Sequence, residues 1–566
     1  MSAAAVPSPI RPDAAGPYTG PDAPCLAIWR SGAKRAFTAA QFWRLAGRYA
    51  AEIARRPDAG RLTLVMSETA IDAIAFFVGG ICAGRLVSFF PPSNPIQDSA
   101  HYFEQQAKAI ERIAPERIVL FDKAAHDRAA PIAGASGAAL ELVAPLSAAD
   151  EAAGDWRAAR AAFDARLADH AAARPLFVQH SSGTTGLKKA VGIHARQLHA
   201  QHDAYWVATV KARISADPSV ASWLPLYHDM GLIATLMLPL VDGTPVTFMD
   251  PFEWVARPQI FLDMLHETGA SLCWMPNFAF RHYTRLRPHM KRRDLSRVAA
   301  WISCSETCRG ADAEAFEQAY ADWGVRPASV VGCYAMAETV FAVSQALPGA
   351  HRTLGVAPGT AIGETVGADA VGVAGAKSIL SSGAALPRTG LGVYVDGKPA
   401  PDGTYGEIGV SGDLVFDGYL GLTREASQIT ADGVFMTGDL GVARDGEIYV
   451  FGRIKDMIIV NGKNLYASDI EALVGGVEGV RPGRVVALGV LNDQSGTEDL
   501  VIVAERRDAA GDAQKVAAQV SELVASAFLV KPRRVLLVED RWLVKSTSGK
   551  ISRADNLRKY LAQFAA

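Results

Sequence analysis

Short apolar runs alternate with longer helical patterns along most of the chain. Residues 62–66 (LTLVM) and 85–92 (RLVSFFPP) have the apolar, β-rich character of strands, and residues 70–84 between them have the composition of a buried helix. This alternation of strands and helices is typical of α/β proteins. The pattern therefore predicts an α/β fold from residue 62 onward.

A loop rich in serine, threonine and glycine interrupts this pattern near residue 181. The alanine-rich, charged residues 148–174 predict an exposed helix, and PLFVQH at 175–180 predicts a strand that ends where the loop begins. Residues 195–210 have helical character, so the sequence predicts that the loop connects a strand to a helix. Phosphate-binding loops commonly have this setting.

The pattern changes again near residue 450. Residues 446–474 contain a Gly-Arg turn, a β-rich run and the start of a helix, and a small α/β pattern follows them, with strands near 484–490, 500–504 and 533–538 and a helix near 512–527. A chain of 566 residues is also too long for one compact core. We therefore predict two domains, residues 1–452 and 453–566, with the boundary at about Phe451–Asp456.

Composition and charge exclude several other classes of protein. Apolar residues make up 49% of the chain, and 57 basic residues nearly balance 59 acidic ones, which gives no indication of nucleic-acid binding. Six scattered cysteines do not form a disulfide framework. The most apolar stretches, residues 73–84 and 232–241, are too short to span a bilayer, and the N-terminus has no signal-peptide pattern. We therefore predict a cytoplasmic protein without a membrane span.

The loop itself, QHSSGTTGLKKAV at residues 179–191, combines glycines, hydroxyl groups and lysines. Glycine allows positive φ, hydroxyl and N–H groups donate hydrogen bonds, and lysine adds positive charge, so such a loop can surround a phosphate chain. By itself, the stretch fits a Ser/Gly-rich surface turn equally well. It is not a Walker loop, because only two residues separate Gly183 from Gly186 and Ala190 follows Lys189.

Four further stretches decide between these interpretations. They are SWLPLYHDMGL (222–232), GCYAMAET (332–339), the segment from MTGDLG to GRIKD (436–456) and STSGKISR (546–553). With the loop, and in this order, they resemble the acyl-adenylating superfamily, which includes acyl-CoA synthetases, peptide-synthetase adenylation domains, luciferases and fatty acyl-AMP ligases. The resemblance covers nearly the whole chain. It implies a large N-terminal adenylate-forming domain and a small, mobile C-terminal α+β domain.

The resemblance also implies a site for ATP and Mg²⁺. Glu338 would hold Mg²⁺, a hard ion that prefers oxygen ligands, and Asp439 and Arg453 would bind the ribose. Lys550 would be the catalytic cation that bridges the carboxylate and the α-phosphate. From the residues alone, Asp439 would be a turn residue and Lys550 an idle surface lysine. The other residues that the resemblance places around ATP are Ser181, Ser182, Gly183, Thr184, Thr185, Gly186, Lys189, Ser305, Glu306, Tyr334 and Thr339.

On the carboxylate side, the chain most resembles fatty acyl-AMP ligases. The similarity lies in WLPLYHDMGL, in WMPNFAFRHYTR (274–285) and in SETCRGADAEAFEQAY (305–320). It implies that His228 borders the acyl carboxylate. Core packing explains the aromatic residues of the second stretch equally well, and a histidine such as His228 can also be a hydrogen-bonded core residue. The residues that the resemblance places along the acyl pocket are Asn277, Phe278, Phe280 and Ala335.

The chain departs from the usual family pattern at several positions. Lys188 and Ala190 stand where the loop usually has proline and glycine. Ala337 stands where many relatives have threonine, which removes one hydrogen bond to phosphate, and Ala467 replaces a usual proline. Ala335 replaces a glycine and adds a methyl group beside the acyl site. None of these changes removes a charged catalytic group, so we expect activity to persist, with the chain-length preference left open.

The implied reaction has two half-reactions. The carboxylate of a fatty acid attacks the α-phosphate of ATP, which gives acyl-AMP and pyrophosphate, and a thiol then displaces AMP. We expect the thiol to belong to a separate acyl carrier protein, because the segment between Glu338 and residues 381–387 is longer than in short-linker CoA synthetases. Lys455 matches the hinge about which the small domain turns. The alternative within the same fold is an acyl-CoA or aryl-CoA synthetase. A catalytically silent binding protein is a third possibility, but such a protein would be expected to have lost some of the charged residues that this chain retains.

Overall fold

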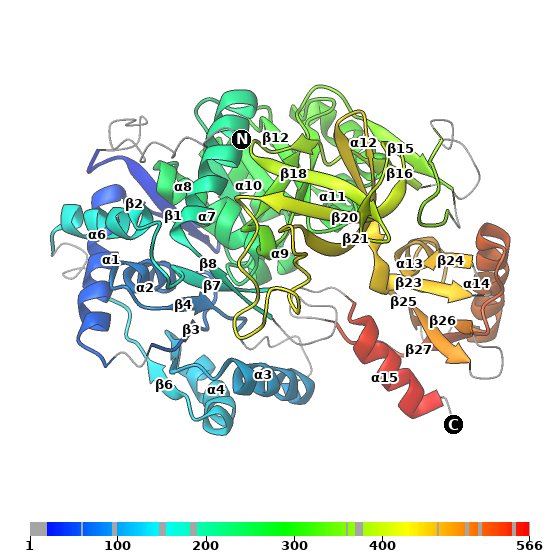
Figure 1. Cartoon of the computed structure of the whole chain (residues 1–566), viewed down its shortest axis with the longest axis horizontal. Helices are drawn as coiled ribbons and strands as arrows, with labels where there is room; N and C mark the ends of the chain where they lie inside the picture. Colours follow the sequence, from blue (N-terminus) through cyan, green and yellow to red (C-terminus); the bar gives the residue numbers. More distant parts are fainter. Residues whose placement is uncertain are drawn as a thin grey trace.

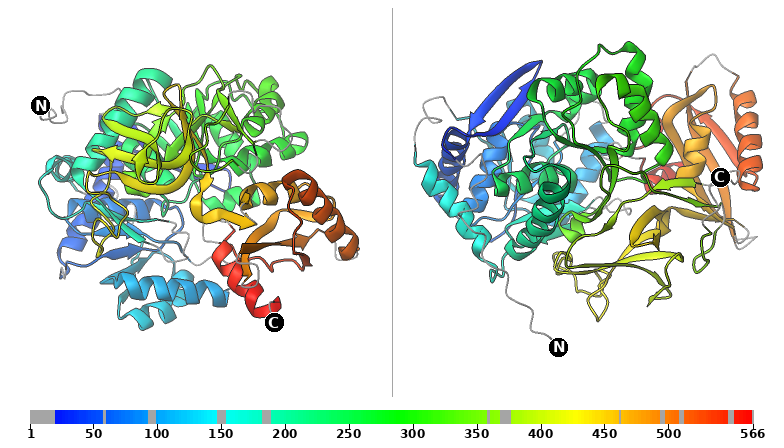
Figure 2. Two further views of the ribbon diagram at one scale, coloured as in Figure 1. Left: turned by 45° about the vertical axis from the view of Figure 1, so that its right-hand side comes forward. Right: turned by 90° about the horizontal axis from the view of Figure 1, so that it is seen from above.

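The computed structural model describes residues 20–57, 60–92, 99–146, 154–181, 189–357, 360–367, 377–460, 463–492, 497–507, 512–545 and 551–564. It shows a mixed α/β protein with a large N-terminal domain and a small C-terminal domain, which lies at the right in Figure 1 and is coloured orange to red. The two views in Figure 2 also place the small domain at one side of the large one. The predicted fold class is therefore confirmed.

Among the described residues, nine strands form the largest sheet, in the order β17-β14-β13-β12-β11-β9-β10-β1-β2. The strands from β13 to β1 in this order are parallel to one another, and β2, β14 and β17 join antiparallel. Because β9, β11, β12 and β13 are parallel neighbours, their carboxyl ends meet at one edge, where ligands bind in open α/β sheets. The bounds are β1 Pro24–Arg30, β2 Ala33–Thr38, β9 Val220–Ser222, β10 Val246–Met249, β11 Leu272–Pro276, β12 Ala300–Cys304, β13 Val330–Ala335, β14 Ala342–Gln345 and β17 Ala384–Ala385.

A second, four-stranded parallel sheet, β4-β3-β5-β6, contains the first predicted strands. Helix α2 (Ile71–Cys82) connects β3 to β4 and is buried on nearly all sides, as its apolar composition predicts. Its Gly79 lies against α1 so closely that a Cβ there would be 2.7 Å from the carbonyl oxygen of Ala46. The bounds are β3 Thr63–Val65, β4 Val87–Phe89, β5 Arg117–Leu120, β6 Ala139–Leu142, α1 Ala39–Ala54, α3 Ser99–Ile113 and α4 Lys123–Ser136.

Within the alanine-rich stretch, helix α6 spans Trp156–Ala168. It is amphipathic, because Ala159, Phe163 and Leu167 are buried while most of its other side chains face solvent. The ring centroid of Phe163 lies 5.2 Å from that of Trp43 on α1. The predicted helix is therefore confirmed over these residues, with one face packed on the domain.

The Ser/Thr/Gly-rich loop connects two strands, so the prediction of a strand followed directly by a helix is wrong. β7 (Phe177–Ser181) pairs antiparallel with β8 (Lys189–Ile193), and residues 182–188 between them lie outside the described residues. The short segment KAVGI forms a strand because it pairs with β7 and buries Val191 and Ile193 completely. The expected helix begins afterwards, as α7 (Ala195–Gln201).

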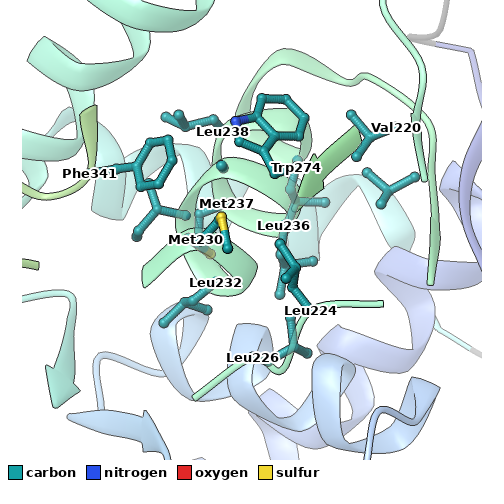
Figure 3. Close-up of a cluster of buried hydrophobic side chains, with 14 of the residues drawn as sticks. Val220, Leu224, Leu226, Met230, Leu232, Leu236, Met237, Leu238, Trp274 and Phe341 are labelled. Carbon is teal, nitrogen blue, oxygen red and sulfur yellow. The ribbon is translucent and has the colours of Figure 1, made fainter. Parts of the chain in front are cut away.

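Two π-helices lie close to the predicted motifs. The first, η1 (His202–Ile214), continues α7, and the second, η2 (Met230–Met237), begins inside the HDMGL sequence. Figure 3 shows side chains of η2 packed together with Leu224 and Trp274, in a cluster that is almost completely buried. The segment between β9 and η2 is thus fixed on the hydrophobic core of the large domain.

The other helices of the large domain connect the strands of the nine-stranded sheet or extend such connections. Their bounds are α8 Leu238–Asp242, α9 Pro251–Ala256, α10 Gln259–Thr268, α11 Asn277–Leu286, η3 Arg287–His289, α12 Gly310–Tyr320, η4 Ala321–Trp323 and η5 Ala337–Thr339.

Antiparallel strands complete the large domain and lead into the small one. The five-stranded sheet β19-β18-β20-β21-β22 and the pair β15-β16 precede a short 3₁₀ turn, η7 (Ile454–Asp456). The bounds are β15 Thr353–Val356, β16 Lys377–Leu380, β18 Thr389–Val395, β19 Lys398–Pro399, β20 Tyr405–Gly412, β21 Phe435–Arg444 and β22 Glu447–Arg453.

The small domain has its own hydrophobic core, whose buried residues run from Ile458 to Val530. This core begins close to the predicted boundary at Phe451–Asp456, which remains a prediction. The three strands and the helix predicted near 484–538 are confirmed as β25, β26, β27 and α14. The bounds are β23 Met457–Val460, β24 Lys463–Tyr466, α13 Ala467–Val474, β25 Val480–Asn492, β26 Thr497–Arg506, α14 Ala513–Phe528, β27 Arg534–Val538 and α15 Arg553–Phe564.

Within the residues that the structure describes, no helix combines the length and the apolar character needed to cross a membrane.

Candidate active site

A cavity of about 380 Å³ lies at the carboxyl ends of the parallel strands of the large sheet. Trp223 follows β9, Pro276 ends β11, Ser305 follows β12 and Ala335 ends β13, and all four line the cavity. The cavity wall also brings together other residues that the sequence predicted for the site. These are Lys189, His228, Phe278, Glu338, Arg453 and Lys455.

One end of the cavity carries a cluster of positive charges. Lys189, Arg453 and Lys455 come from β8, β22 and η7 and all line the wall. Burial lowers the pKa of Lys189, and the positive charge of Lys455 lowers it further, while Glu338 acts in the opposite direction. Lysines that repel each other across a cavity are suited to an anion between them, and a polyphosphate is such an anion.

Glu338 lies on the 3₁₀ turn η5, directly after β13, and Tyr419 holds its side chain. The Tyr419 hydroxyl donates to Glu338 Oε1 at 2.6 Å, and Lys189 Nζ lies 4.3 Å from the centre of the Tyr419 ring. Burial and the adjacent Glu338 charge raise the pKa of Tyr419 far above its usual range, so its hydroxyl stays a donor. Tyr419 thus contacts both the carboxylate and the lysine at this end.

The backbone around Tyr419 connects the same parts of the site. The Phe416 N–H donates to the Glu338 carbonyl at 2.8 Å, and the Leu420 N–H donates to the Ala190 carbonyl at 2.9 Å. Residues 416–420 therefore join the Glu338 turn to β8, which directly follows the Ser/Thr/Gly-rich loop. Sequence analysis did not identify Tyr419, because these contacts span some 80 to 230 positions of the chain and leave no local pattern.

The donor set at Glu338 fits Mg²⁺ that is bound together with phosphates. In the described part of the chain, no group of three or more His, Cys, Asp or Glu residues could hold a metal by itself. Mg²⁺ commonly takes one or two protein carboxylates and completes its shell with substrate phosphates and water. A single carboxylate beside a cluster of cations matches that arrangement.

Asp439 forms a buried hydrogen-bonded cluster directly behind the cavity wall. It lies opposite Arg453 in the β21–β22 register, and Arg453 Nε is 2.9 Å from Asp439 Oδ1. The Tyr334 hydroxyl donates to Asp439 Oδ2 at 2.7 Å. The Asp439 charge raises the pKa of Arg453, while burial and then Asp439 raise that of Tyr334. Asp439 and Tyr334 are thus adjacent to the lining residue Arg453 but are not themselves part of the wall.

Ser305 and Glu306, which follow β12, have different positions. Ser305 lines the cavity with φ of 70°, a left-handed conformation that non-glycine residues adopt at a cost. Glu306 Oε2 accepts a hydrogen bond from the Phe278 N–H at 3.0 Å, at the first turn of α11. Free N–H groups at a helix start need such acceptors, so Glu306 fixes the helix that carries Phe278 to the cavity.

Three further predicted residues, beside Glu306, Tyr334 and Asp439, do not line the cavity. Asn277 donates to Asp312 Oδ2 at 2.8 Å and accepts from the Arg309 N–H, which fixes the start of α11. Phe280 is fully buried, with its ring centroid 5.3 Å from that of Phe316. The hydroxyl of the buried Thr339 donates to the carbonyl of Phe341 at 2.9 Å, within its own turn.

Several predicted residues lie outside the described residues. They are Ser182, Gly183, Thr184, Thr185, Gly186 and Lys550, while only the backbone of Ser181 is described, at the end of β7. The described Lys545 precedes residues 546–550 and pairs with Ile551 in an isolated bridge. Burial, followed by the charge of Arg484, lowers the pKa of Lys545 to about 8, while the charges of Glu505 and Glu306 act in the opposite direction. Lys545 therefore lies within electrostatic reach of Glu306.

Comparison with known proteins agrees with this geometry. Residues 16–420 match the family described as AMP-binding enzyme. A putative acyl-CoA synthetase of Caulobacter vibrioides is 31% identical over 403 residues, which cover 69% of this chain and 68% of the relative. The long-chain-fatty-acid–AMP ligase FadD26 of Mycobacterium marinum is 30% identical over 410 residues, which cover 68% and 69% of the two chains. FadD28 of Mycobacterium tuberculosis, also a long-chain-fatty-acid–AMP ligase, is 25% identical over 92% of both chains.

Solved structures share the fold over nearly the whole chain. One from a study of fatty acyl-adenylate ligases of E. coli and L. pneumophila has a TM-score of 0.77 at 21% identity and covers 96% of this chain and 95% of its own. The structure of McyG A-PCP complexed with phenylalanyl-adenylate also has a TM-score of 0.77, at 17% identity, and covers 96% of this chain and 81% of its own.

The chain therefore belongs to the family of AMP-binding enzymes. Within that family it is an adenylate-forming ligase, and the resemblance inferred from its motifs is confirmed.

Proposed function

We propose that the protein activates a fatty acid with ATP to give acyl-AMP and then transfers the acyl group to the phosphopantetheine thiol of a separate acyl carrier protein. The observation that carries this proposal is the composition of the cavity. Its lining combines the cations Lys189, Arg453 and Lys455 and the carboxylate of Glu338 with apolar side chains, among them Trp223, Leu224, Pro276 and Phe278. One site therefore suits both a nucleotide with its phosphates and an acyl group.

In the first half-reaction, an oxygen of the carboxylate attacks the α-phosphate, and pyrophosphate leaves. Two anions approach each other in this step, so a fixed cation between them stabilises the transition state. Lys550 has this role in the proposal, with His228 beside the carboxylate. Lys189 holds the β- and γ-phosphates, and Mg²⁺ at Glu338 would neutralise part of their charge. Asp439, paired with Arg453, is positioned to bind the ribose hydroxyls.

In the second half-reaction, the small domain turns about Lys455. This residue lies in η7, a turn of only three residues between β22 and β23. A hinge needs a short segment that absorbs a large change in φ and ψ. Lys455 also lines the cavity, so a change in this turn would alter the charged end of the site as the domain moves.

The packing around β15 and β16 supports a carrier protein as the acceptor. These strands lie in the long segment after Glu338, and they share a hydrophobic cluster with Phe451. Ile454, Met457 and Tyr466, which belong to the hinge and the first hairpin of the small domain, pack against the same cluster. The contacts restrict how the small domain can turn, so we expect them to disfavour CoA through geometry while a carrier-bound arm is still admitted.

The proposal predicts a strong preference between the two thiols. Purified acyl-AMP is mixed with the enzyme and with either free CoA or a holo acyl carrier protein, and thioester formation is followed over time. We expect rapid acylation of the carrier protein and little acyl-CoA. A mixture without enzyme measures the uncatalysed reaction.

Efficient production of acyl-CoA would contradict the carrier-protein acceptor and would favour an acyl-CoA synthetase. That second candidate is supported by the similarity to the Caulobacter protein, which is described as a putative acyl-CoA synthetase. The adenylation half-reaction is the same in both cases.

A further inference from the structure

A stacked pair of indole rings contributes to the apolar part of the cavity wall. Trp223 lines the cavity, and Trp254, which does not, lies face to face with it on the other side. The ring centroids are 3.8 Å apart and the planes differ by 2°. Both residues are buried, with 5% and 3% of their surface exposed. The Trp223 ring therefore faces the cavity, and the Trp254 ring supports it from behind.

The second ring is fixed by hydrogen bonds and by its helix. The Trp254 indole N–H donates to the Tyr283 hydroxyl at 2.7 Å, and that hydroxyl donates to the Pro258 carbonyl at 3.0 Å. Helix α9, which carries Trp254, is capped by Asp250, whose carboxylate accepts from the Phe252 N–H at 2.8 Å. Trp254 therefore has no simple way to move aside when a ligand presses on Trp223.

A third aromatic residue stands beside this wall. Phe278, which lines the cavity at the start of α11, lies edge-on to Trp254, with ring centroids 6.0 Å apart and planes inclined by 70°. The Phe278 N–H is bound by Glu306, so the start of α11 is fixed as well. Aromatic side chains from two elements, Trp223 after β9 and Phe278 on α11, thus line the cavity.

The position of Trp223 in the cavity suggests which part of the substrate it would contact. The residues at the ends of β9 and β11, including Trp223, Leu224, Pro276 and Phe278, are apolar, whereas Glu338 and Arg453 lie toward β13 and β22. A nucleotide with its phosphates at the charged end leaves the apolar end for the acyl chain. The cavity of about 380 Å³ is near the lower limit of about 300–1,000 Å³ for ligand sites, and the nucleotide must share it.

We propose that the stacked pair Trp223–Trp254 limits the substrate to short-chain fatty acids. This inference rests on the proposed function, since an acyl chain reaches the wall only if the enzyme activates a carboxylic acid. A long chain would have to displace a buried indole that is held by a second, hydrogen-bonded indole.

The test measures kcat/KM for acid-dependent ATP–pyrophosphate exchange with straight-chain acids from butanoate to hexadecanoate. For the unmodified enzyme, we expect the highest value among the short acids and a steep fall beyond them, since one methylene group too many in a tight pocket costs about 10–200-fold. In Trp223→Ala the wall is opened, and we expect kcat/KM for dodecanoate, relative to hexanoate, to rise by about tenfold or more.

Trp254→Leu tests the second ring. With a smaller side chain behind it, the Trp223 ring can tilt away from the cavity, so we expect a shift toward longer acids in the same direction as in Trp223→Ala. The matched control is Trp206→Leu. Trp206 is fully buried and stacked on Trp274, with centroids 6.2 Å apart, but it does not line the cavity. Its loss should lower stability and leave the order of preferred acids unchanged.

The outcomes separate the inference from the proposed function. A preference of the unmodified enzyme for dodecanoate or longer acids would overturn the inference while the proposed function stands. An unchanged chain-length profile in folded Trp223→Ala and Trp254→Leu would also overturn it, as would an equal shift in Trp206→Leu. Exchange with none of the acids would contradict the proposed function, and the inference with it.

Discussion

Replacement of Lys550 by alanine is expected to slow acyl-adenylate formation by about a hundredfold or more while ATP still binds. Removal of one preorganised electrostatic contact to a developing charge typically costs this much in rate. ATP also contacts the Ser/Thr/Gly-rich loop, Lys189 and the Asp439–Arg453 pair in our proposal, so its affinity should change little. Pyrophosphate exchange measures the rate, and calorimetry measures ATP binding.

Lys531→Ala is the matched control for this substitution. Lys531 is an exposed lysine of the same small domain, and it does not line the cavity. The control removes the same charge and should leave the exchange rate unchanged. If exchange in Lys550→Ala stays within a factor of a few of the unmodified enzyme, Lys550 is not the catalytic cation.

Glu338→Gln is expected to weaken the response of exchange to Mg²⁺, with the half-saturating concentration raised by more than about tenfold. The amide keeps the shape of the side chain but removes the negative charge that a divalent cation requires. Tyr419→Phe should cause a smaller shift in the same direction, because partners that orient a metal ligand typically contribute about 10–100-fold to metal affinity. The Mg²⁺ dependence of the binding of a non-hydrolysable ATP analogue provides a readout other than activity.

Tyr449→Phe removes a hydroxyl from another buried tyrosine, on β22, and serves as the control for Tyr419→Phe. We expect its Mg²⁺ titration to coincide with that of the unmodified enzyme. An unchanged titration in Glu338→Gln would exclude Glu338 as the residue that holds Mg²⁺. A shift in Glu338→Gln without one in Tyr419→Phe would show that Tyr419 does not orient the carboxylate.

Local sequence patterns predicted much of the fold, because many of its helices and strands have a recognisable periodicity or composition of their own. The apolar helix α2 between two short strands and the alternation of elements in the small domain are examples. The strand β8 was missed because five residues carry too little periodicity, and its conformation depends on pairing with β7. The π-helices η1 and η2 were not predictable either, since both have side-chain patterns that pass for ordinary helices.

The motifs predicted well which residues line the cavity. They predicted less well which atoms each of these residues contacts. Lys189, Glu338 and Arg453 line the cavity together although they come from distant strands and turns. Glu306, in contrast, binds the start of α11. Phe280 packs against Phe316, as expected for a core residue. Tyr419 and Trp254 act through tertiary contacts, so no spacing in the sequence reveals them.

The most direct test of the central claim is ATP–pyrophosphate exchange by the unmodified enzyme with and without a carboxylic acid. The acids should include straight-chain fatty acids and aryl acids, and no thiol should be present. We predict exchange that depends on both Mg²⁺ and a fatty acid and that is negligible without the acid. An absence of acid-dependent exchange across the whole panel, in a folded enzyme that binds ATP, would contradict acyl-adenylate formation.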